Sequence, residues 1–278
     1  MENKRVVVTG MGVISSVGND VESFWTSLKN GVCGIGYIDE FDTGELPVKI
    51  AGKVKNFNPE DYGMDKPFIR KQDRFSQYGM AAAWQAMNDS GLVSSAEDGN
   101  IDPFRLGVYV GSGIGGFEIQ QRETAKMVED PSGKWVSPLF IPTMISNIAA
   151  GHIAIKHNAQ GPCLDIVTAC ATSSHCIGEA FRAIRHGYAD AIIAGGCEYA
   201  TIPIGIAGFA NAKALSRSED PNYASLPFNK NRQGFVMGDG AGILVLEELE
   251  HAKARGANIY GEVVGYGNTC DAYHPTAP

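Results

Sequence analysis

One cysteine, Cys170, stands at a predicted junction between a strand and a helix. Residues 164–167 are typical of a buried strand, and Thr172 opens a segment of helical period. A thiol at such a junction faces unpaired N–H groups at the positive end of the helix dipole, and both features favour the thiolate. Ala169 and Ala171 are small enough for a substrate carbonyl to approach, and backbone N–H groups of the turn can face an oxyanion. The pattern predicts a nucleophile for acyl transfer, with a buried structural cysteine as the alternative.

The other thiols and the imidazoles have no comparable setting. The remaining cysteines are Cys33, Cys163, Cys176, Cys197 and Cys270, and no two cysteines form a C-x-x-C pair. Reduced thiols are therefore the simplest interpretation, and no zinc site is indicated. His274 follows a glycine-spaced strand near the end of the sequence, so a Cys–His pair with Cys170 stays open at this stage.

A glycine-rich segment, residues 111–116, satisfies the pattern G-x-G-x-x-G after a predicted strand. A dinucleotide site would need a compact strand–helix–strand unit, but the next convincing strand begins only near residue 164. We therefore interpret the segment as a tight turn where backbone segments approach closely, and keep dinucleotide binding as the alternative.

The elements that must position Cys170 alternate between short apolar runs and segments of helical period. Strands are predicted at residues 5–9, 106–110, 164–167, 191–194 and 259–264, and residues 235–237 and 243–246 are predicted to form an antiparallel pair. Helices are predicted from Asp20 to near Gly31 and at residues 73–90, 143–157, 172–186 and 248–255. Residues 6–12 and 262–267 resemble each other as a faint repeat, which is a sign of two related halves. The alternation predicts a layered α/β fold.

Composition limits the class of protein. The sequence has 278 residues, of which 44% are hydrophobic and 19% are charged, so a sizeable core is expected and bulk disorder is not. The formal net charge of -8 argues against nucleic acid as a general partner. No apolar run is long enough to span a bilayer, and the first residues do not have the sections of a signal peptide. A cytoplasmic location is expected, without a membrane partner.

The segment around Cys170, Thr168-Ala169-Cys170-Ala171-Thr172-Ser173, resembles the nucleophile motif of the beta-ketoacyl-ACP synthases, a family also called 3-oxoacyl-[acyl-carrier-protein] synthases or ketosynthases. Within that family, the sequence is most similar to the synthase II type of bacterial fatty acid synthesis. Further similar motifs follow in order at residues 8–12, 111–116, 146–152, 194–196, 234–242 and 271–274. So many motifs in one order make the resemblance specific, and it runs from Arg5 to Pro278.

The resemblance implies a thiolase-like α/β fold with layers in the order α-β-α-β-α, built from two related halves. Residues 1–250 would form the N-terminal half that carries the nucleophile, and residues 251–278 would begin a C-terminal half that is largely missing from the sequence. The family commonly forms homodimers and needs no cofactor or metal.

The resemblance also implies an acyltransferase reaction. Cys170 would accept an acyl chain from acyl carrier protein as a thioester, and malonyl-ACP would lose carbon dioxide and attack that thioester to give 3-oxoacyl-ACP. Ile114, Phe140 and Phe209 match positions of the acyl pocket. Positions of a mobile loop at the active site are matched by Asp271, His274 and Thr276, so His274 is expected to gate the site rather than pair with Cys170. Residues that match the region facing the carrier protein are Lys66, Arg70, Lys71, Lys134 and Lys213.

Two histidine motifs that the family uses for condensation are not found in this sequence. We therefore predict that a polypeptide of residues 1–278 does not complete the condensation by itself. Asn229 and Gln233 also depart from acidic residues common in the family, which affects expected loop interactions. The alternatives are a polyketide ketosynthase, a thiolase acting on coenzyme A, and a non-catalytic partner subunit similar to a chain-length factor, although such subunits commonly lack the cysteine.

Overall fold

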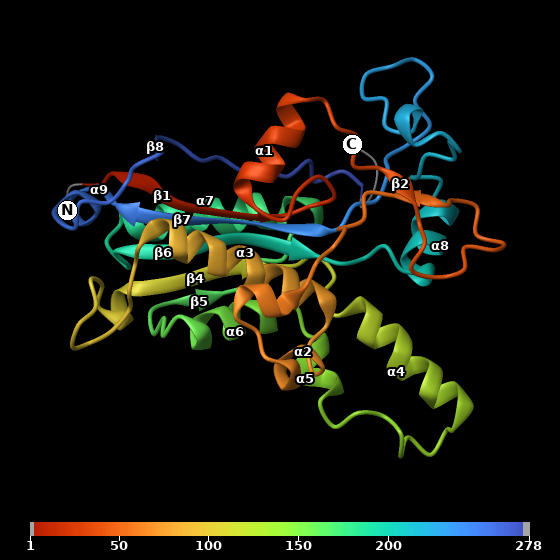
Figure 1. The fold of residues 1–278 in the computed structure, drawn as a ribbon, viewed down its shortest axis with the longest axis horizontal. Helices are drawn as coiled ribbons and strands as arrows, with labels where there is room; N and C mark the ends of the chain where they lie inside the picture. The colour runs from red at the N-terminus through yellow and green to blue at the C-terminus, as the bar shows by residue number, and fades with distance from the viewer. Residues whose placement is uncertain (1–2, 275–278) are drawn as a thin grey trace.

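A mixed six-stranded sheet organises the part of the chain that the computed structural model describes, residues 3–274 (Figure 1). Its strand order is β5-β4-β6-β7-β1-β8. The strands are β1 (Val6–Ile14), β4 (Leu106–Gly111), β5 (Cys163–Leu164), β6 (Ala191–Glu198), β7 (Gly240–Glu248) and β8 (Gly261–Val263). Strands β5, β4 and β6 run parallel, whereas β7 is antiparallel to β6 and β1, and β8 is antiparallel to β1.

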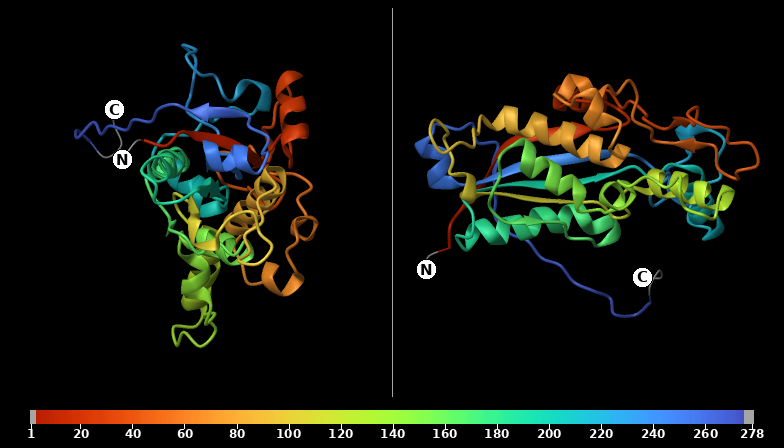
Figure 2. Two further views of the ribbon diagram at one scale, coloured as in Figure 1. Left: turned by 90° about the vertical axis from the view of Figure 1, so that its left-hand side faces the viewer. Right: turned by 90° about the horizontal axis from the view of Figure 1, so that it is seen from below.

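Helices cover both faces of this sheet. α3 (Arg74–Ser90) and α6 (Ile148–Lys156) pack on one face, and α7 (Thr172–Arg185) packs on the other (Figures 1 and 2). Local sequence sets the ends of α3, because the Asp73 side chain accepts a hydrogen bond from the N–H of Phe75 and Gly91 adopts a left-handed φ of 65°. The residues that the structure describes thus form three layers in the order α-β-α.

Small residues allow α3 to lie unusually close to β1. A Cβ atom on Gly10 would lie 2.1 Å from the carbonyl oxygen of Ala86, and one on Gly12 would lie 1.9 Å from that of Ala82. Only glycine fits at these two positions of the strand. The first glycine pair of the sequence therefore serves helix–sheet packing.

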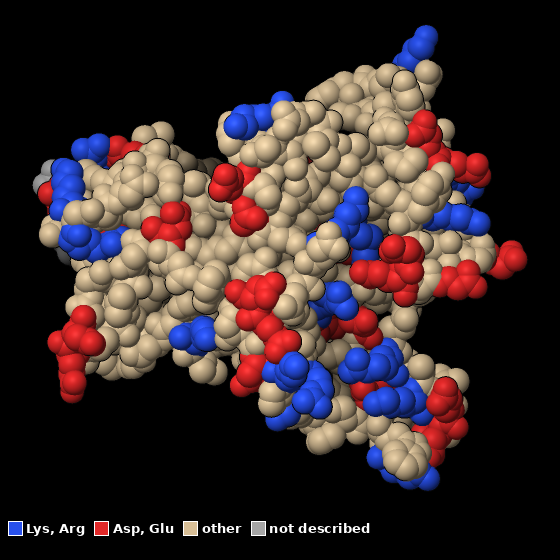
Figure 3. All heavy atoms as spheres, in the orientation of Figure 1, with Lys and Arg blue, Asp and Glu red and all other residues tan. Residues whose placement is uncertain are grey.

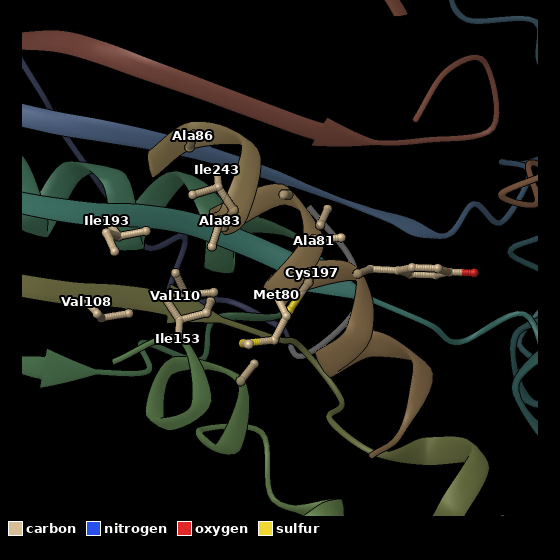
Figure 4. Packing of buried hydrophobic residues seen from close by; sticks show 14 of the residues in the cluster. Met80, Ala81, Ala83, Ala86, Val108, Val110, Ile153, Ile193, Cys197 and Ile243 are labelled. Carbon is tan, nitrogen blue, oxygen red and sulfur yellow. The ribbon is translucent and has the colours of Figure 1, made fainter. Parts of the chain in front are cut away.

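The main core fills the space between α3, α6 and the sheet. Figure 4 shows Met80 and Ala83 of α3 facing Val110, Ile193 and Ile243 of three neighbouring strands. All five side chains are buried, and Ile193 and Val110 are fully inaccessible to solvent. Burial on this scale stabilises the sheet because each apolar side chain removed from water contributes about 1.5–3 kcal/mol.

Most of the remaining elements lie toward the end of the sheet that is shared by the carboxyl ends of β4 and β6, whereas the short helix after β7 lies at the opposite end (Figure 1). The helices are α1 (Val21–Lys29), α2 (Lys66–Ile69), α4 (Phe117–Glu129), α5 (Phe140–Met144), α8 (Pro203–Asn211) and α9 (Leu249–Ala254), and β2 (Gly36–Tyr37) pairs with β3 (Ile50–Ala51). α4 projects away from the sheet (Figure 1). Among residues 3–274, no helix combines the length and apolarity needed to cross a membrane.

Several sequence-based predictions are confirmed. The helix capped by Asp20 is α1, and the helices predicted at residues 73–90, 172–186 and 248–255 are α3, α7 and α9. The strands predicted at residues 5–9 and 191–194 are present and are longer, as β1 and β6. Strand 106–110 is β4, and the strand at 259–264 is shorter, as β8.

Other predictions are wrong. The helix predicted at residues 143–157 is two helices, α5 and α6, because Ile145 between them has an extended backbone with ψ 138°. Residues 235–237 do not pair with 243–246: Phe235 bridges Leu215 instead, and β7 pairs with β1 and β6. The strand at 164–167 is reduced to the two residues of β5, and α8 was not predicted. For residue 235 and for β5, the pairing partner belongs to another segment of the chain.

Candidate functional site

Cys170 lies in a strained turn between the end of β5 and the start of α7. Ala169 adopts a left-handed φ of 50°, which is unfavourable for a residue with a side chain. Residues Ala169–Ala171 form one 3₁₀ turn that leads directly into α7, and no side chain caps the N-terminus of that helix. The turn is held by the N–H of Thr168, which donates to the Thr172 hydroxyl at 2.8 Å. The Cys170 thiol is exposed at the positive end of the helix dipole, as the sequence predicts.

Glycines at the ends of β4 and β6 make room for this turn. A Cβ on Gly111 would lie 2.5 Å from the Thr172 methyl group, and one on Gly113 would lie 3.3 Å from the Ala169 carbonyl oxygen. On Gly115 and Gly116, a Cβ atom would collide with backbone atoms of residues 143–146. These contacts confirm the interpretation of residues 111–116 as a tight turn with close backbone approach.

A half-buried carboxylate, Glu198, fixes the glycine turn beside the nucleophile. Its two oxygens accept hydrogen bonds from the Ser112 hydroxyl and the Gly113 N–H, both at 2.8 Å, and Ser112 in turn accepts from the Gly115 N–H at 2.9 Å. Burial raises the pKa of Glu198 above its ordinary value, although the hydrogen bonds oppose that change. Only one feature marks Glu198 in the sequence: it is a charged residue that ends the apolar strand β6.

Cys170 opens into a cavity of about 600 Å³. Ile114 and Phe209 line the same cavity, so the structure brings three of the predicted site residues together. The opposite wall is the segment 235–242, and Phe209 meets Phe235 edge-on with ring centroids 5.5 Å apart. The lining also includes Ala169, Thr172, Ser173, Gly196, Cys197, Glu198, Ala200 and Asp239. Apart from Glu198 and Asp239, the residues that line the cavity present mostly apolar side chains or backbone atoms, which suits an alkyl chain.

The other predicted substrate residues lie outside this cavity. Phe140 is half-buried at the start of α5 and does not line the cavity. Asp271 and His274 are exposed in the coil that follows β8, and Thr276 lies outside the described residues.

The coil after β8 crosses the outer face of α7. The ring of Tyr266 lies flat on the helix at Gly178, where a Cβ would come within 2.1 Å of the ring, and the Arg182 guanidinium stands 4.8 Å from the ring centroid. Further along, Cys270 lines a second hollow together with Thr168 and His175. The coil therefore runs from the middle of α7 toward the turn that carries Cys170.

The five basic residues predicted to face a carrier protein are all exposed: Lys66, Arg70, Lys71, Lys134 and Lys213. Lys66 lies 3.8 Å from Glu60, and Lys134 lies 3.1 Å from Asp130. Lysine and arginine side chains gather over α2 and α4 on the face drawn in Figure 3, mixed with acidic ones. The surface over α2 and α4 is therefore mixed in charge, with exposed lysine and arginine side chains among acidic ones.

The buried thiols and imidazoles are poorly suited to be the nucleophile or its base. Burial raises the pKa of Cys176 to about 11 and raises that of Cys197 well above its ordinary value. Burial lowers the pKa of His157 to about 4, and His251 of α9 bonds to Glu247 of β7 instead. Within residues 3–274, no group of three His, Cys, Asp or Glu side chains is arranged to hold a metal ion.

Known proteins share this arrangement. A family model described as Beta-ketoacyl synthase, N-terminal domain, matches residues 3–252. The 3-oxoacyl-[acyl-carrier-protein] synthase 2 of Vibrio cholerae is 52% identical over 279 aligned residues, and that of Staphylococcus aureus strain N315 is 49% identical over 277. Both alignments cover 100% of this chain and 66% of the relative, so the chain spans about two thirds of the length of these relatives.

Solved structures of ketosynthases superpose on the fold. The ishigamide ketosynthase/chain length factor matches with a TM-score of 0.88 at 34% identity, and a beta-ketoacyl synthase from Burkholderia phymatum with 0.87 at 33%. Each match covers 99% of this chain and 66% of the other. The nucleophile turn, the layered thiolase-like fold and these matches agree, and the chain therefore belongs to the beta-ketoacyl synthase family, of which it contains the N-terminal domain.

Proposed function

We propose that this chain supplies the acyl-accepting part of a 3-oxoacyl-[acyl-carrier-protein] synthase of fatty acid synthesis. The observation that carries the proposal is the Cys170 thiol, which stands at the N-terminus of α7 and opens into a largely apolar cavity. Identities of 48–52% to synthases of this name support a fatty acid substrate over a polyketide one. The end of the family model at residue 252 supports a domain boundary near residue 250.

The first chemical step is transthioesterification. The Cys170 thiolate adds to the carbonyl carbon of an acyl thioester, and the carbonyl oxygen becomes an oxyanion that backbone N–H groups of the turn can stabilise. The bond between that carbon and the donor sulfur then breaks, and the departing thiolate takes up a proton. The acyl chain is left on Cys170.

The second step forms the carbon–carbon bond. Malonyl-ACP loses carbon dioxide, and the resulting carbanion attacks the carbonyl carbon of the Cys170 thioester. The sulfur of Cys170 leaves as a thiolate, and the product is 3-oxoacyl-ACP. Residues 1–278 lack the family's two histidine motifs, so the inability of this polypeptide to condense stays a prediction, tested with purified protein and malonyl-ACP.

The cavity walls give the acyl chain its binding energy. Ile114 and Phe209 would contact the chain, and each methylene that they remove from water contributes about 0.8 kcal/mol. The coil with Asp271 and His274 is proposed as a gate, because its path along α7 leads toward the nucleophile turn. Phe140 and Thr276 stay predicted substrate residues.

Two protein partners are proposed. The exposed basic side chains in α2 and directly after it would receive an acidic acyl carrier protein, so the double charge reversal Arg70→Glu with Lys71→Glu should weaken carrier binding and its dependence on salt. A second copy of this chain would cover the edge formed by β5 and the neighbouring α6, where Leu164 of β5, Val167 after it and Ile155 of α6 are 47%, 50% and 80% exposed. Sedimentation analysis should give a dimer; a monomer at micromolar concentration would count against the homodimer.

The central test is covalent labelling. After incubation with acyl-ACP, mass spectrometry should find one acyl adduct, on Cys170, and Cys170→Ala should abolish it. Cys33→Ala is the matched control, because Cys33 is also exposed and lies outside the cavity. No adduct on the unmodified protein would favour the non-catalytic partner role.

A further inference from the structure

One buried ammonium group stands behind the cavity wall. The Lys53 side chain is only 7% exposed, and its Nζ lies 2.8 Å from Glu40 Oε2, 2.9 Å from Asp239 Oδ2 and 2.7 Å from the Thr201 hydroxyl. These three oxygens match the three N–H bonds of an ammonium group. The ring of Tyr199 adds a cation–π contact, with its centroid 4.3 Å from Nζ.

Asp239 connects this ammonium to the cavity. Its carboxylate is fully buried and accepts hydrogen bonds from the N–H groups of Ala200 and Thr201 and from the Thr201 hydroxyl. Ala200 and Asp239 line the cavity from two segments, one after β6 and one before β7. Asp239 therefore joins two walls of the cavity, and Lys53 is its cation partner, shared with the partly exposed carboxylate of Glu40.

Backbone hydrogen bonds bring Lys53 to that place. The N–H of Gly52 donates to the Met237 carbonyl at 2.8 Å, and the N–H of Asp239 donates to the Gly52 carbonyl at 3.1 Å. Gly52 and Gly238 thus form a parallel bridge directly beside the ion pair. The segment that ends β3 is in this way attached to the wall opposite Cys170.

The cavity would be strongly acidic without this cation. Glu198 and Asp239 both line it, and their negative charges interact across the cavity wall. Two uncompensated carboxylates would hold water and oppose an alkyl chain, because a buried charge needs a partner or solvent. The ion pair with Lys53 neutralises one of the two.

From this arrangement we infer that Lys53 is a positioning residue that determines acyl-chain selectivity: through Asp239 it keeps the wall at residues 235–242 closed, dry and neutral, so that the cavity accepts long alkyl chains. Lys53 does not itself line the cavity and acts through Asp239. The inference rests on the proposed function, since it assumes that Cys170 accepts acyl groups.

The test compares a long and a short acyl donor. Acetyl and dodecanoyl pantetheine thioesters are given to the unmodified protein and to Lys53→Met, and the rate of adduct formation on Cys170 is followed by mass spectrometry. An acetyl group occupies little of a cavity of about 600 Å³, whereas a dodecanoyl chain must contact its walls. Lys53→Met should slow dodecanoyl transfer by about tenfold or more and acetyl transfer by less than about threefold, because only the long chain contacts the wall that contains the unpaired carboxylate.

Two further variants separate charge compensation from a general loss of structure. Lys53→Met combined with Asp239→Asn removes the ammonium and the fully buried carboxylate, leaves Glu40, 31% exposed, in contact with solvent, and should restore most of the dodecanoyl rate. Lys55→Met changes an exposed lysine two residues along and should leave both rates unchanged. Equal slowing of both donors by Lys53→Met, or no recovery in the double variant, would overturn the inference. Absence of any adduct on the unmodified protein would instead contradict the proposed function.

Discussion

Strand β7 has a buried carboxylate near each end, and the two carboxylates have different surroundings. Asp239 directly precedes the strand and meets Lys53 and the cavity, whereas Glu247 near the other end meets Arg255, His251 and Thr9, far from Cys170. Both side chains are fully buried and both are fully hydrogen-bonded. The comparison teaches that burial and pairing alone do not mark a functional carboxylate; contact with a cavity does.

The Glu247 cluster joins the first strand to the last described helix. Arg255 of the α9 C-terminus donates two hydrogen bonds to Glu247, both at 2.7 Å, and Thr9 of β1 donates a third at 2.8 Å. Burial would raise the pKa of Glu247, but these bonds and the one to His251 outweigh it and lower the pKa to about 2. The cluster therefore stabilises the ionised carboxylate and the fold around it.

The largest expected effect on stability is at this remote end. Glu247→Gln leaves the Arg255 guanidinium, 11% exposed, without its counter-charge and should reduce the free energy of unfolding by about 3 kcal/mol or more. Urea denaturation measures the loss. The ratio of dodecanoyl to acetyl transfer by the folded protein should not change; a changed ratio would remove the distinction between the two ends.

A matched control lies on the same helix. Glu250 is 71% exposed and pairs with Lys253 at 2.9 Å. Glu250→Gln should change the free energy of unfolding by less than about 0.5 kcal/mol, since exposed ion pairs contribute little. A loss as large as that of Glu247→Gln would show that charge removal, not burial, causes the effect.

An intermediate effect is expected at the cavity end. Lys53→Met should destabilise the fold by about 3 kcal/mol because Asp239 is left buried and unpaired, and adding Asp239→Asn should recover most of that loss. Lys53→Met is also expected to change chain selectivity and the double variant to restore it, whereas Glu247→Gln should leave selectivity unchanged. Measuring unfolding and transfer on one set of proteins would show whether the two properties recover together.

The smallest effect is a pH dependence at the Glu247 cluster. The hydrogen bond to Glu247 raises the pKa of His251, although burial opposes this. A raised histidine pKa gives stability that is fully present below about pH 6.5 and is lost as the pH rises through the folded-state value. Glu247 has a lowered pKa, so its contribution is present above its ordinary value and is lost only as the pH falls toward about 2.

His251→Gln should therefore cost about 1 kcal/mol near pH 6 and less near pH 9, because the neutral histidine of the parent protein contributes less to the pair. Urea denaturation of the parent and the variant at both pH values measures the difference. An equal loss at both values would mean that His251 contributes only packing.

The sequence by itself determined the features that depend on short segments. Asp20 and Asp73 were expected to begin helices and Gly91 to end one, because a cap bonds to N–H groups only a few residues away. Cys170 was marked for the same reason, since its environment is the start of the helix that follows it. The ordered motifs indicate the likeness to ketosynthases from sequence alone, and the match of the family model to residues 3–252 confirms it.

Only the tertiary structure decided the features that join distant segments. Lys53 follows a two-residue strand and gave no signal in the sequence, yet it compensates Asp239, which stands beside it only because residues 52 and 238 form a bridge. The expected pairing of residues 235–237 with 243–246 failed because β6 and β1 occupy both edges of β7. Local propensity acts over a few residues, whereas partners for buried charges and strand edges are chosen by the packing of the whole chain.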